Sequence, residues 1–153
     1  MTNIAQMVNV LQSMILTDSG KMVLTPTYHV YKMYLPFQDA TFLPVKMDAG
    51  QYTLGTTTLP KVDAIAARGK DGKVWLSLTN LDPNKSALFT ADIAGVTAKA
   101  ALGETLTADK IDSVNSFEAP NAVVPKPFSA KPQGGTLVLT LAPHSVTVVQ
   151  LQP

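Results

Sequence analysis

Apolar residues recur every three or four positions over the first sixteen residues of the chain. Four of them form one stripe of a predicted helix from Asn3 to Leu16: Ile4, Val8, Leu11 and Ile15. Three more apolar residues widen the stripe beyond one face: Met7, Val10 and Met14. A helix with so wide an apolar surface needs cover on more than one side. The rest of the chain is β-patterned and offers cover from one direction only, so we expect this opening to be the end of a larger unit cut off upstream.

The next residues predict a strand and a second helix. A polar break from Thr17 to Lys21 ends the first helix, and Gly20 supplies the left-handed position of the turn. Lys21 to Thr25 is a short apolar strand, and Pro26, which the first turn of a helix tolerates, begins a helix that runs to Tyr34. Helix, strand and helix in this order are typical of a parallel barrel or sheet.

After Gln38 the pattern changes to short strands separated by turns. The predicted strands are residues 40–47, 62–68, 73–80, 87–93, 97–106, 136–141 and 145–151, with Val123–Val124 as a further candidate. Turn sequences separate them, among them Asp71-Gly72 and Gly134-Gly135. Strands at this spacing predict a mainly β domain built as an antiparallel, jelly-roll-like sandwich. The predicted boundary divides the chain into residues 1–38 and 39–153.

One predicted strand leaves two interpretations open. In Ser145–Leu151, Val146 and Val148 face one side, while Val149 and Leu151 face the other. Such a strand is either buried on both faces or carries a β-bulge that changes its alternation.

Composition narrows the classes of partner. The 153 residues carry a net charge of +1 and no cysteine, which excludes disulfides and thiolate metal sites. No basic patch is present, so nucleic acid is not an expected partner. No apolar run approaches the roughly 20 residues that cross a bilayer. We expect a soluble protein and no membrane partner, and the compartment, cytoplasm or periplasm, stays open.

Several motifs resemble the C-terminal end of the family-51 α-L-arabinofuranosidases. They are NIAQMVNVLQ at 3–12, MVLTPTYHV at 22–30, MY at 33–34, QDAT at 38–41 and LTNLDP at 78–83. The closing LAPHSVTVV at 141–149 is also similar to that family, although it recurs in other glycosidase β-domains. The resemblance spans the whole chain, and its first two motifs are the most specific.

The resemblance implies a larger enzyme. Members of that family carry the active site in a (β/α)8 barrel followed by a jelly-roll-like sandwich. They remove terminal α-L-arabinofuranosyl groups from arabinan and arabinoxylan with retention of configuration, use no metal or organic cofactor, and are often homo-oligomers. Residues 1–38 would be the last barrel elements and residues 39–153 the accessory sandwich. The partners implied are the remainder of the enzyme chain and, through it, arabinose-containing saccharides.

The chain itself lacks the expected chemistry. A retaining glycosidase needs two carboxyl groups about 5 Å apart. The only glutamates, Glu104 and Glu118, lie in the β-patterned part next to turns or loops, where ionised side chains are usually solvated. The resemblance places the catalytic glutamates upstream of Asn3. We therefore predict no catalytic residue in this chain and no hydrolysis by it alone.

The resemblance assigns Gln6 as a substrate contact. The glutamine of the family's N-x-A-Q motif hydrogen-bonds the arabinose in the subsite before the cleaved bond. A side-chain amide both donates and accepts, as a sugar hydroxyl requires. The alternative is a solvated amide. His29 has no partner at metal spacing or orienting partner, so a packed or surface histidine is the interpretation we favour.

Trp75 is the candidate for stacking on a glycan. Alternation places it on the polar side of its strand with Lys73, Ser77 and Thr79. An exposed tryptophan on a sandwich is how a carbohydrate-binding module holds sugar. With Tyr52 it would form a free-standing sugar-binding module, the alternative to the enzyme fragment, and a purely structural domain is a third possibility. The interpretation we favour for Trp75 is burial under the N-terminal elements or a loop.

Overall fold

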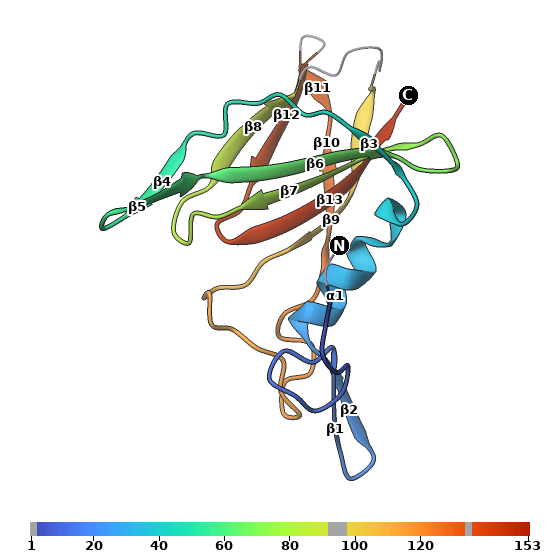
Figure 1. The fold of residues 1–153 in the computed structure, drawn as a ribbon, viewed down its shortest axis with the longest axis vertical. Helices are drawn as coiled ribbons and strands as arrows, with labels where there is room; N and C mark the ends of the chain where they lie inside the picture. The colour runs from blue at the N-terminus through green and yellow to red at the C-terminus, as the bar shows by residue number, and fades with distance from the viewer. Residues whose placement is uncertain (1–2, 92–97, 134–135) are drawn as a thin grey trace.

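The computed structural model describes residues 3–91, 98–133 and 136–153 (Figure 1). It contains one α-helix, α1 (Pro26–Met33), followed by a 3-10 turn at Leu35–Phe37, within those residues. The strands are β1 (Ile15–Asp18), β2 (Lys21–Leu24), β3 (Thr41–Leu43), β4 (Gln51–Leu54), β5 (Thr57–Pro60), β6 (Val62–Arg68), β7 (Val74–Asn80), β8 (Ala87–Ala91), β9 (Ala100–Leu106), β10 (Lys126–Ala130), β11 (Pro132–Gln133), β12 (Thr136–Leu141) and β13 (Ser145–Gln152).

Two antiparallel sheets form the body of the molecule. The larger has the order β10-β9-β13-β7-β6-β3, and the smaller has the order β11-β12-β8. Apolar side chains from both sheets form one buried cluster, which includes Leu78 of β7, Leu139 of β12 and Val149 of β13. The chain is therefore mainly β, as predicted, and its two layers enclose the core expected of a β-sandwich.

Alternation along β7 explains how the larger sheet has two different faces. Val74, Leu76 and Leu78 are buried against the smaller sheet, whereas Trp75 and Thr79 point to the outer face and are partly exposed. This confirms the inward face predicted for 73–80. Leu137, Leu139 and Leu141 of β12 are likewise all buried, as predicted.

Strand β13 is buried on both faces. It pairs with β7 from Ser145↔Asn80 to Gln150↔Trp75, and with β9 from Val146↔Leu106 to Gln152↔Ala100, with no break in either register. Val148 and Val149 point to opposite faces, and both are buried. Of the two interpretations of this strand, burial on both faces is confirmed and the bulge is wrong.

Gly103 allows β9 to approach β13. A Cβ at this position would collide with the Val148 carbonyl oxygen and the Val149 Cα. Because those are backbone atoms, a side chain here would push the two strands apart.

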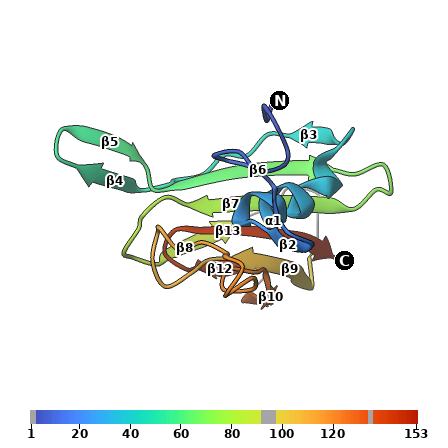
Figure 2. The same ribbon diagram turned by 90° about the horizontal axis from the view of Figure 1, so that it is seen from below.

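Helix α1 packs on the outer face of the larger sheet (Figure 2). Thr25 caps the helix by accepting a hydrogen bond from the Tyr28 N–H, and Pro26 occupies its first turn, as predicted. Met33 joins Leu106 and Val148 of the sheet and Val123 of the following loop in a second buried cluster. The hydroxyl of Ser77 on β7 donates to the Tyr34 hydroxyl. The helix thus belongs to the same packed unit as the sheet.

The helix predicted from Asn3 to Leu16 is wrong. Residues 3–14 form turns without helix, and Ile15 begins β1. Asn9 has a positive φ of 54°, and its side chain donates to the Thr17 hydroxyl and accepts from the Thr17 N–H. A residue in this conformation interrupts a helix. The three-to-four spacing therefore belongs to an irregular segment, in which Met7, Val8 and Leu11 are exposed while Ile4, Val10 and Met14 are partly buried.

The polar break at 17–21 is the turn of a β-hairpin rather than the end of a helix. Strands β1 and β2 pair antiparallel from Ile15↔Leu24 to Asp18↔Lys21. Ser19 and Gly20 both have positive φ, 44° and 85°, as a two-residue hairpin turn requires. The strand predicted at 21–25 is thus present, but it belongs to a hairpin and not to a parallel sheet.

Other predictions differ in extent. The strand predicted at 40–47 shortens to β3, although Leu43, Val45 and Met47 still pack on the core. No strand forms at Val123–Val124, while the uncharged hairpin β4–β5 and the strands β10 and β11 were not expected. Residues 92–93 of the strand predicted at 87–93, residue 97 of the strand predicted at 97–106, and the predicted turn at 134–135 lie outside the described residues. The division into residues 1–38 and 39–153 stays a prediction.

Candidate functional site

Gln6 lies on an open, largely apolar hollow formed by the N-terminal segment and α1. The residues that line the hollow are Ile4, Ala5, Gln6, Met7, Val8, Met14 and Tyr31. Two hydrogen bonds hold the segment against β1: the Asn9 N–H donates to the Ile15 carbonyl and the Ile15 N–H donates to the Met7 carbonyl, both at 3.0 Å. The Gln6 side chain is exposed, so a ligand can reach its amide group.

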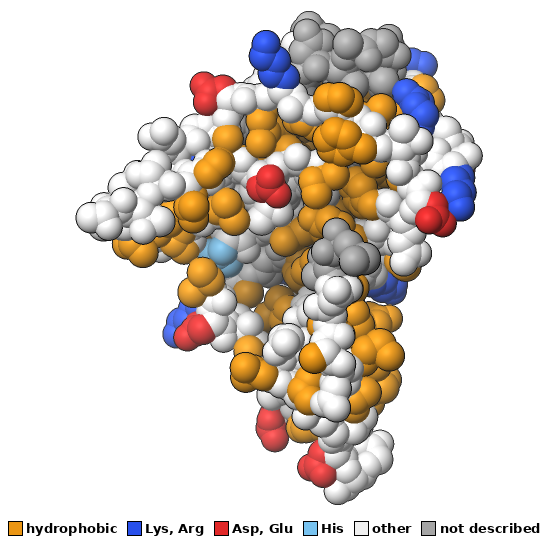
Figure 3. Space-filling model, viewed as in Figure 1, with side chains coloured by type: hydrophobic (Ala, Val, Ile, Leu, Met, Phe, Trp, Pro, Cys, Tyr) orange, Lys and Arg blue, Asp and Glu red, His pale blue; other side chains and the backbone are white. Residues whose placement is uncertain are grey.

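Apolar side chains surround this hollow and continue over the N-terminal hairpin. Leu11 is 98% exposed, and Met7 and Met22 are each 62% exposed. The space-filling view shows hydrophobic side chains over the lower part of the molecule, where α1 and the β1–β2 hairpin lie (Figure 3). Exposed apolar residues that form a large patch are candidates for a binding surface.

His29 is not arranged as a catalytic acid or base. It is buried in α1, with its ring edge-on to Tyr28, and its Nε2 has no hydrogen-bond partner among the described residues. Burial lowers the pKa of His29, and Lys32 lowers it further. An uncharged packed histidine matches the interpretation favoured from the sequence.

The two glutamates lie on different parts of the fold. Glu104 is exposed on the outer face of β9, opposite Val148, and Glu118 is exposed in the segment after β9. A hydrogen bond from Ser116 lowers the pKa of Glu118, whereas a general acid needs a raised pKa. Neither carboxyl group therefore has the surroundings of a glycosidase acid.

Trp75 lies on the outer face of β7, beside the second buried cluster, which includes Met33 of α1. Trp75 is partly buried and packs against the cluster of Met33, Leu106, Val123 and Val148, together with Tyr34 and Phe37. Tyr52 belongs to the β4–β5 hairpin, which extends away from the two sheets (Figures 1 and 2). The structure thus does not gather these two aromatic residues on one platform. Glycan stacking by Trp75 stays a prediction.

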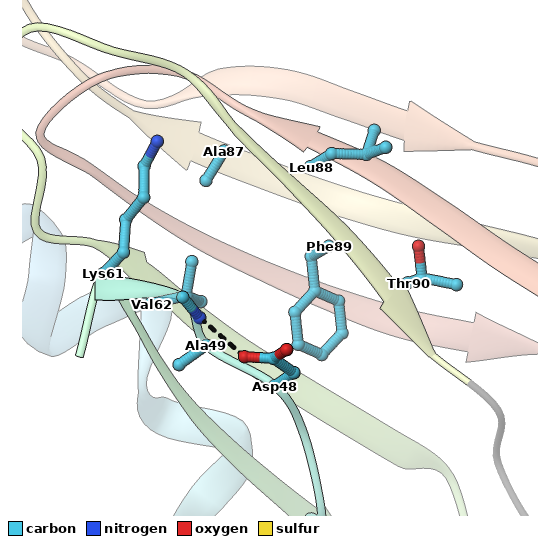
Figure 4. A pocket seen from close by; sticks show the side chains of 9 residues that line it. Asp48, Ala49, Lys61, Val62, Ala87, Leu88, Phe89 and Thr90 are labelled. Carbon is cyan, nitrogen blue, oxygen red and sulfur yellow. Dashed lines mark hydrogen bonds between the residues drawn. The ribbon is translucent and has the colours of Figure 1, made fainter. Parts of the chain in front are cut away.

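A second hollow, not predicted from the sequence, lies beside β8, the edge strand of the smaller sheet (Figure 4). Its lining includes Asp48, Lys61 and Thr90 beside Leu88 and Phe89. One Asp48 oxygen accepts from the Gly50 N–H at 3.0 Å, and Lys61 donates to the Ser86 carbonyl at 3.0 Å. With a single carboxylate, this hollow cannot perform two-carboxylate glycoside hydrolysis. The sequence gives little indication of this hollow, because only the end of the apolar alternation at Met47 and the glycine at Gly50 point to its position.

Groups of three or more histidine, aspartate or glutamate side chains that could hold a metal ion are absent from the described part of the chain. In the same residues, no helix has the length and apolar character needed to cross a membrane.

Residues 1–145 match the family model of the α-L-arabinofuranosidase C-terminal domain. The chain belongs to this family. The chain is 46% identical to an intracellular exo-α-L-arabinofuranosidase of Bacteroides ovatus, over 99% of this chain and 30% of that protein. It is 26% identical to an exo-α-(1→6)-L-arabinofuranosidase of Bifidobacterium longum, over 98% of this chain and 30% of that protein. The chain therefore spans about 30% of the length of the curated relatives that it matches.

Solved structures agree with this assignment. The crystal structure of the GH51 arabinofuranosidase from Xanthomonas axonopodis pv. citri is 48% identical, with a TM-score of 0.94, and the match covers 98% of this chain and 31% of that one. The GH51 enzyme of Thermotoga petrophila, at 22% identity and a TM-score of 0.81 over 97% of this chain and 33% of that one, shares the fold. The resemblance stated from the sequence motifs is confirmed.

Proposed function

We propose that this chain is the C-terminal, accessory part of an α-L-arabinofuranosidase. The whole enzyme would remove terminal α-L-arabinofuranosyl groups from arabinan or arabinoxylan with retention of configuration. The observation that carries the proposal is the match of 99% of this chain, at 46% identity, to 30% of an exo-α-L-arabinofuranosidase. The catalytic glutamates would lie in the part of the enzyme that this chain does not span. By itself the chain would hydrolyse no arabinofuranoside.

Residues 1–38 would be the last elements of the catalytic part of that enzyme and would contact the rest of it. Leu11 is 98% exposed, and Met7 and Met22 are each 62% exposed, so the N-terminal segment and hairpin carry apolar side chains that a neighbouring part of the enzyme could cover. The rest of the (β/α)8 barrel, packed on this surface, would remove it from water. In this proposal the N-terminal segment, β1, β2 and α1 are the last elements of the barrel region, and the sandwich stabilises the barrel from one side.

Gln6 is the residue we propose as a substrate contact. Its amide is exposed beside the N-terminal hollow, where it could donate to one sugar hydroxyl and accept from another. Active sites of barrel enzymes are built from the loops at one rim of the barrel. Residues 3–14 form an irregular segment, which could serve as such a loop at the rim of the barrel.

Two further features follow from the same proposal. The enzyme would be a homo-oligomer, in which part of the exposed apolar surface is shared between copies. It would act inside the cell, as the name of the Bacteroides ovatus relative says of that protein.

The first test is an assay of the chain with and without the upstream portion. The purified chain should give no turnover of a chromogenic α-L-arabinofuranoside. The reading frame upstream of Met1 should encode barrel repeats with an asparagine–glutamate pair, and the protein with that portion included should turn the substrate over. Robust turnover by the chain alone, or a longer protein without activity on any arabinofuranoside, would refute the proposal.

The second test asks about Gln6 directly. A chimera would join the upstream part of the Bacteroides ovatus enzyme to this chain in place of its own C-terminal part. In an active chimera, Gln6→Ala should lower kcat/KM about tenfold or more, the effect expected when a substrate hydrogen bond is removed. Gln12→Ala, at another exposed amide of the same segment, is the matched control and should leave kcat/KM unchanged. Equal values for the two variants would remove Gln6 from the site.

The alternative function, a sugar-binding module, has its own test. Affinity electrophoresis of the chain in gels with arabinan or arabinoxylan should show no retardation. Retardation that disappears in Trp75→Ala but persists in Tyr52→Ala would instead assign Trp75 to glycan stacking.

A further inference from the structure

The β4–β5 hairpin is exposed along both of its strands. Leu54 is 71% exposed and Leu59 is 46% exposed, and residues 49–60 carry no charged side chain. A single two-stranded hairpin is only marginally stable in water, and pairing with a further strand stabilises it. The hairpin extends away from the two sheets on the side of the molecule where β8 lies (Figures 1 and 2). It therefore has the form of an arm that could extend another sheet.

Strand β8 is a sheet edge without the usual protection. Of the other edge strands of the two sheets in the described part of the chain, β10 carries Lys126 and Pro127, β11 is two residues long and carries Pro132, and β3 is three residues long. Lysine, proline and short length each discourage pairing with a further strand. The five residues of β8, ALFTA, have none of these features, and Leu88 is 70% exposed.

The strand register identifies which backbone groups face the free edge of β8. Pro132 has no N–H, so its pair with Leu137 is a non-hydrogen-bonded one, and Leu137 directs its N–H and C=O groups toward β8. Leu137 is therefore hydrogen-bonded to Ala91, and every second residue of β8 is bonded to β12 in the same way. The residues between them, Leu88 and Thr90, direct their N–H and C=O groups away from β12 and toward the free edge.

The same reasoning identifies the free edge of the hairpin. The Lys61 N–H donates to the Gly50 carbonyl at 3.2 Å, so these two residues form a hydrogen-bonded pair at the base of the hairpin. Gln51 and Thr53 then occupy non-hydrogen-bonded positions, and their N–H and C=O groups face the free edge of β4. On β5 the residue opposite Gln51 is Pro60, which has no N–H to donate. Of the two hairpin edges, the edge of β4 is thus the one that keeps all its donors.

We propose that the chain forms a two-fold dimer in which β4 of each copy pairs with the free edge of β8 of the other. Gln51 and Thr53 on β4 have the same spacing as Leu88 and Thr90 on β8, so each arm forms a short β-ladder with the edge that receives it. The residues at the base of the arm line the hollow that borders β8 (Figure 4). Because arm and edge lie side by side, one two-fold axis lets each copy give an arm and accept one.

A second copy fits this edge in charge and in size. The charges of the hollow already have partners: Asp48 accepts from the Gly50 N–H at 3.0 Å, and Lys61 donates to the Ser86 carbonyl at 3.0 Å. An uncharged arm therefore leaves no charge unpaired when it covers them. Residues 51–60 and the nine residues that line the hollow approach the roughly 20 residues that each partner of a stable interface contributes. The inference rests on the homo-oligomer of the proposed function and names its surface.

Mass measurement tests the dimer. Size-exclusion chromatography with light scattering should give about twice 16.3 kDa for the purified chain, with dissociation on dilution. Thr53→Pro removes the donor at the free edge of β4 and leaves the hydrogen bonds between β4 and β5 intact. It should raise the dimer Kd roughly thirtyfold or more, because each dimer loses one ladder donor from each arm.

Thr58→Pro is the matched control for the arm. Thr58 lies opposite Thr53, and either substitution removes the same hydroxyl–hydroxyl hydrogen bond of 3.0 Å between the two threonines. The N–H of Thr58 faces the other edge of the hairpin, so Thr58→Pro should leave the dimer Kd unchanged.

Hydrogen exchange locates the contact at the receiving edge. The amides of Leu88 and Thr90 should be protected in the wild-type dimer and should lose that protection on dilution and in Thr53→Pro. Thr90→Pro, which removes a donor from the free edge of β8 and none from its ladder with β12, should raise the Kd as Thr53→Pro does. Unchanged protection in β7 shows that each variant keeps the sandwich.

Two results would overturn the arm exchange. One is a monomeric mass throughout the concentration series, with or without protection of the Leu88 and Thr90 amides, since protection in a monomer would mean that the arm folds back on its own β8. The other is a dimer whose Kd is the same in the wild type, Thr53→Pro and Thr58→Pro, which would place the contact between copies on another surface. Neither result touches the enzymatic proposal, which the turnover assay tests separately.

Discussion

The sandwich and the N-terminal segment differ in how far they bury their apolar side chains. In the sandwich, Leu78, Leu139 and Val149 are completely buried by strands of the same chain. In residues 3–24, Leu11 is almost completely exposed, although the sequence is just as apolar. The two regions show that apolar content alone does not indicate where a core lies. The strands of the sandwich bury their apolar residues against one another, whereas residues 3–14 form no regular strand and leave Met7, Val8 and Leu11 exposed to water.

The largest expected effect is in the sandwich core. Leu78→Ala should lower the free energy of unfolding by about 3–4 kcal/mol, because it leaves a cavity between two packed sheets. Leu88→Ala on β8 is the control, since Leu88 is exposed and its truncation should cost less than about 0.5 kcal/mol. Urea denaturation measures both. Similar values for the two variants would mean that the core between the sheets is not closely packed.

Asn115 connects the two regions and comes next in size. Asn115→Ala removes the amide that binds the Leu24 and Val123 carbonyls and accepts from the Val123 N–H at 2.7 Å. The buried groups left unpaired should cost about 2 kcal/mol, with faster amide exchange in β2. Asn121→Ala, at an exposed position of the same segment, should change neither the urea midpoint nor the exchange. If amide exchange in β2 is unchanged in Asn115→Ala, the two regions are not energetically coupled through this residue.

Asp82 gives the sandwich an acid sensitivity. The Asn84 N–H, followed by the Lys85 N–H and Lys61, lowers the pKa of Asp82 from its ordinary value of 3.8. A depressed pKa stabilises the fold above the ordinary value, and this contribution disappears as the pH falls through the folded-state pKa. Asp82→Asn should therefore flatten the decline of thermal stability below about pH 4. Asn84→Ala keeps the backbone donor and should retain the wild-type decline; an unaltered decline in Asp82→Asn would exclude this carboxylate.

The smallest effect is expected where the N-terminal segment is most exposed. Leu11→Ser should change the free energy of unfolding of the chain by less than about 0.5 kcal/mol, because the side chain gains little cover in the folded state. The same substitution should weaken the contact with the catalytic part in the chimera and lower its thermal midpoint. A large loss of stability in the isolated chain would mean that Leu11 is buried by its own chain.

The regular strands could be predicted because their signal is local. The bounds predicted for 62–68 and 136–141 coincide with β6 and β12, and α1 begins at Pro26 as its proline and capping threonine indicate. Alternation identifies these strands because one face of each meets a core within the chain. The closing strand 145–151 was harder, since residues buried on both faces remove the alternation.

The rest depends on contacts that no local pattern contains. The β4–β5 hairpin is exposed along nearly its whole length, so its sequence shows no alternation. Pro127 and Pro132 make β10 and β11 hard to predict, because proline is rare inside strands. Both strands lie at sheet edges, where proline is tolerated. The helix predicted at 3–16 is wrong because exposed and partly buried apolar residues of an irregular segment follow a helical spacing there. For the candidate site, the position of Trp75 depends on α1, some forty residues earlier, and could not be read from β7.

The central place of β13 has a consequence for how the protein is made. This strand is translated after all the others, yet it lies between β7 and β9 and supplies the ladder partner of both. On the ribosome, β7 and β9 must therefore wait with unpaired edges until residues 145–152 emerge, a state in which strands readily associate with other nascent chains. A stop codon just before Ser145 would make that transient state permanent and yield aggregated polypeptide in place of a weakened fold.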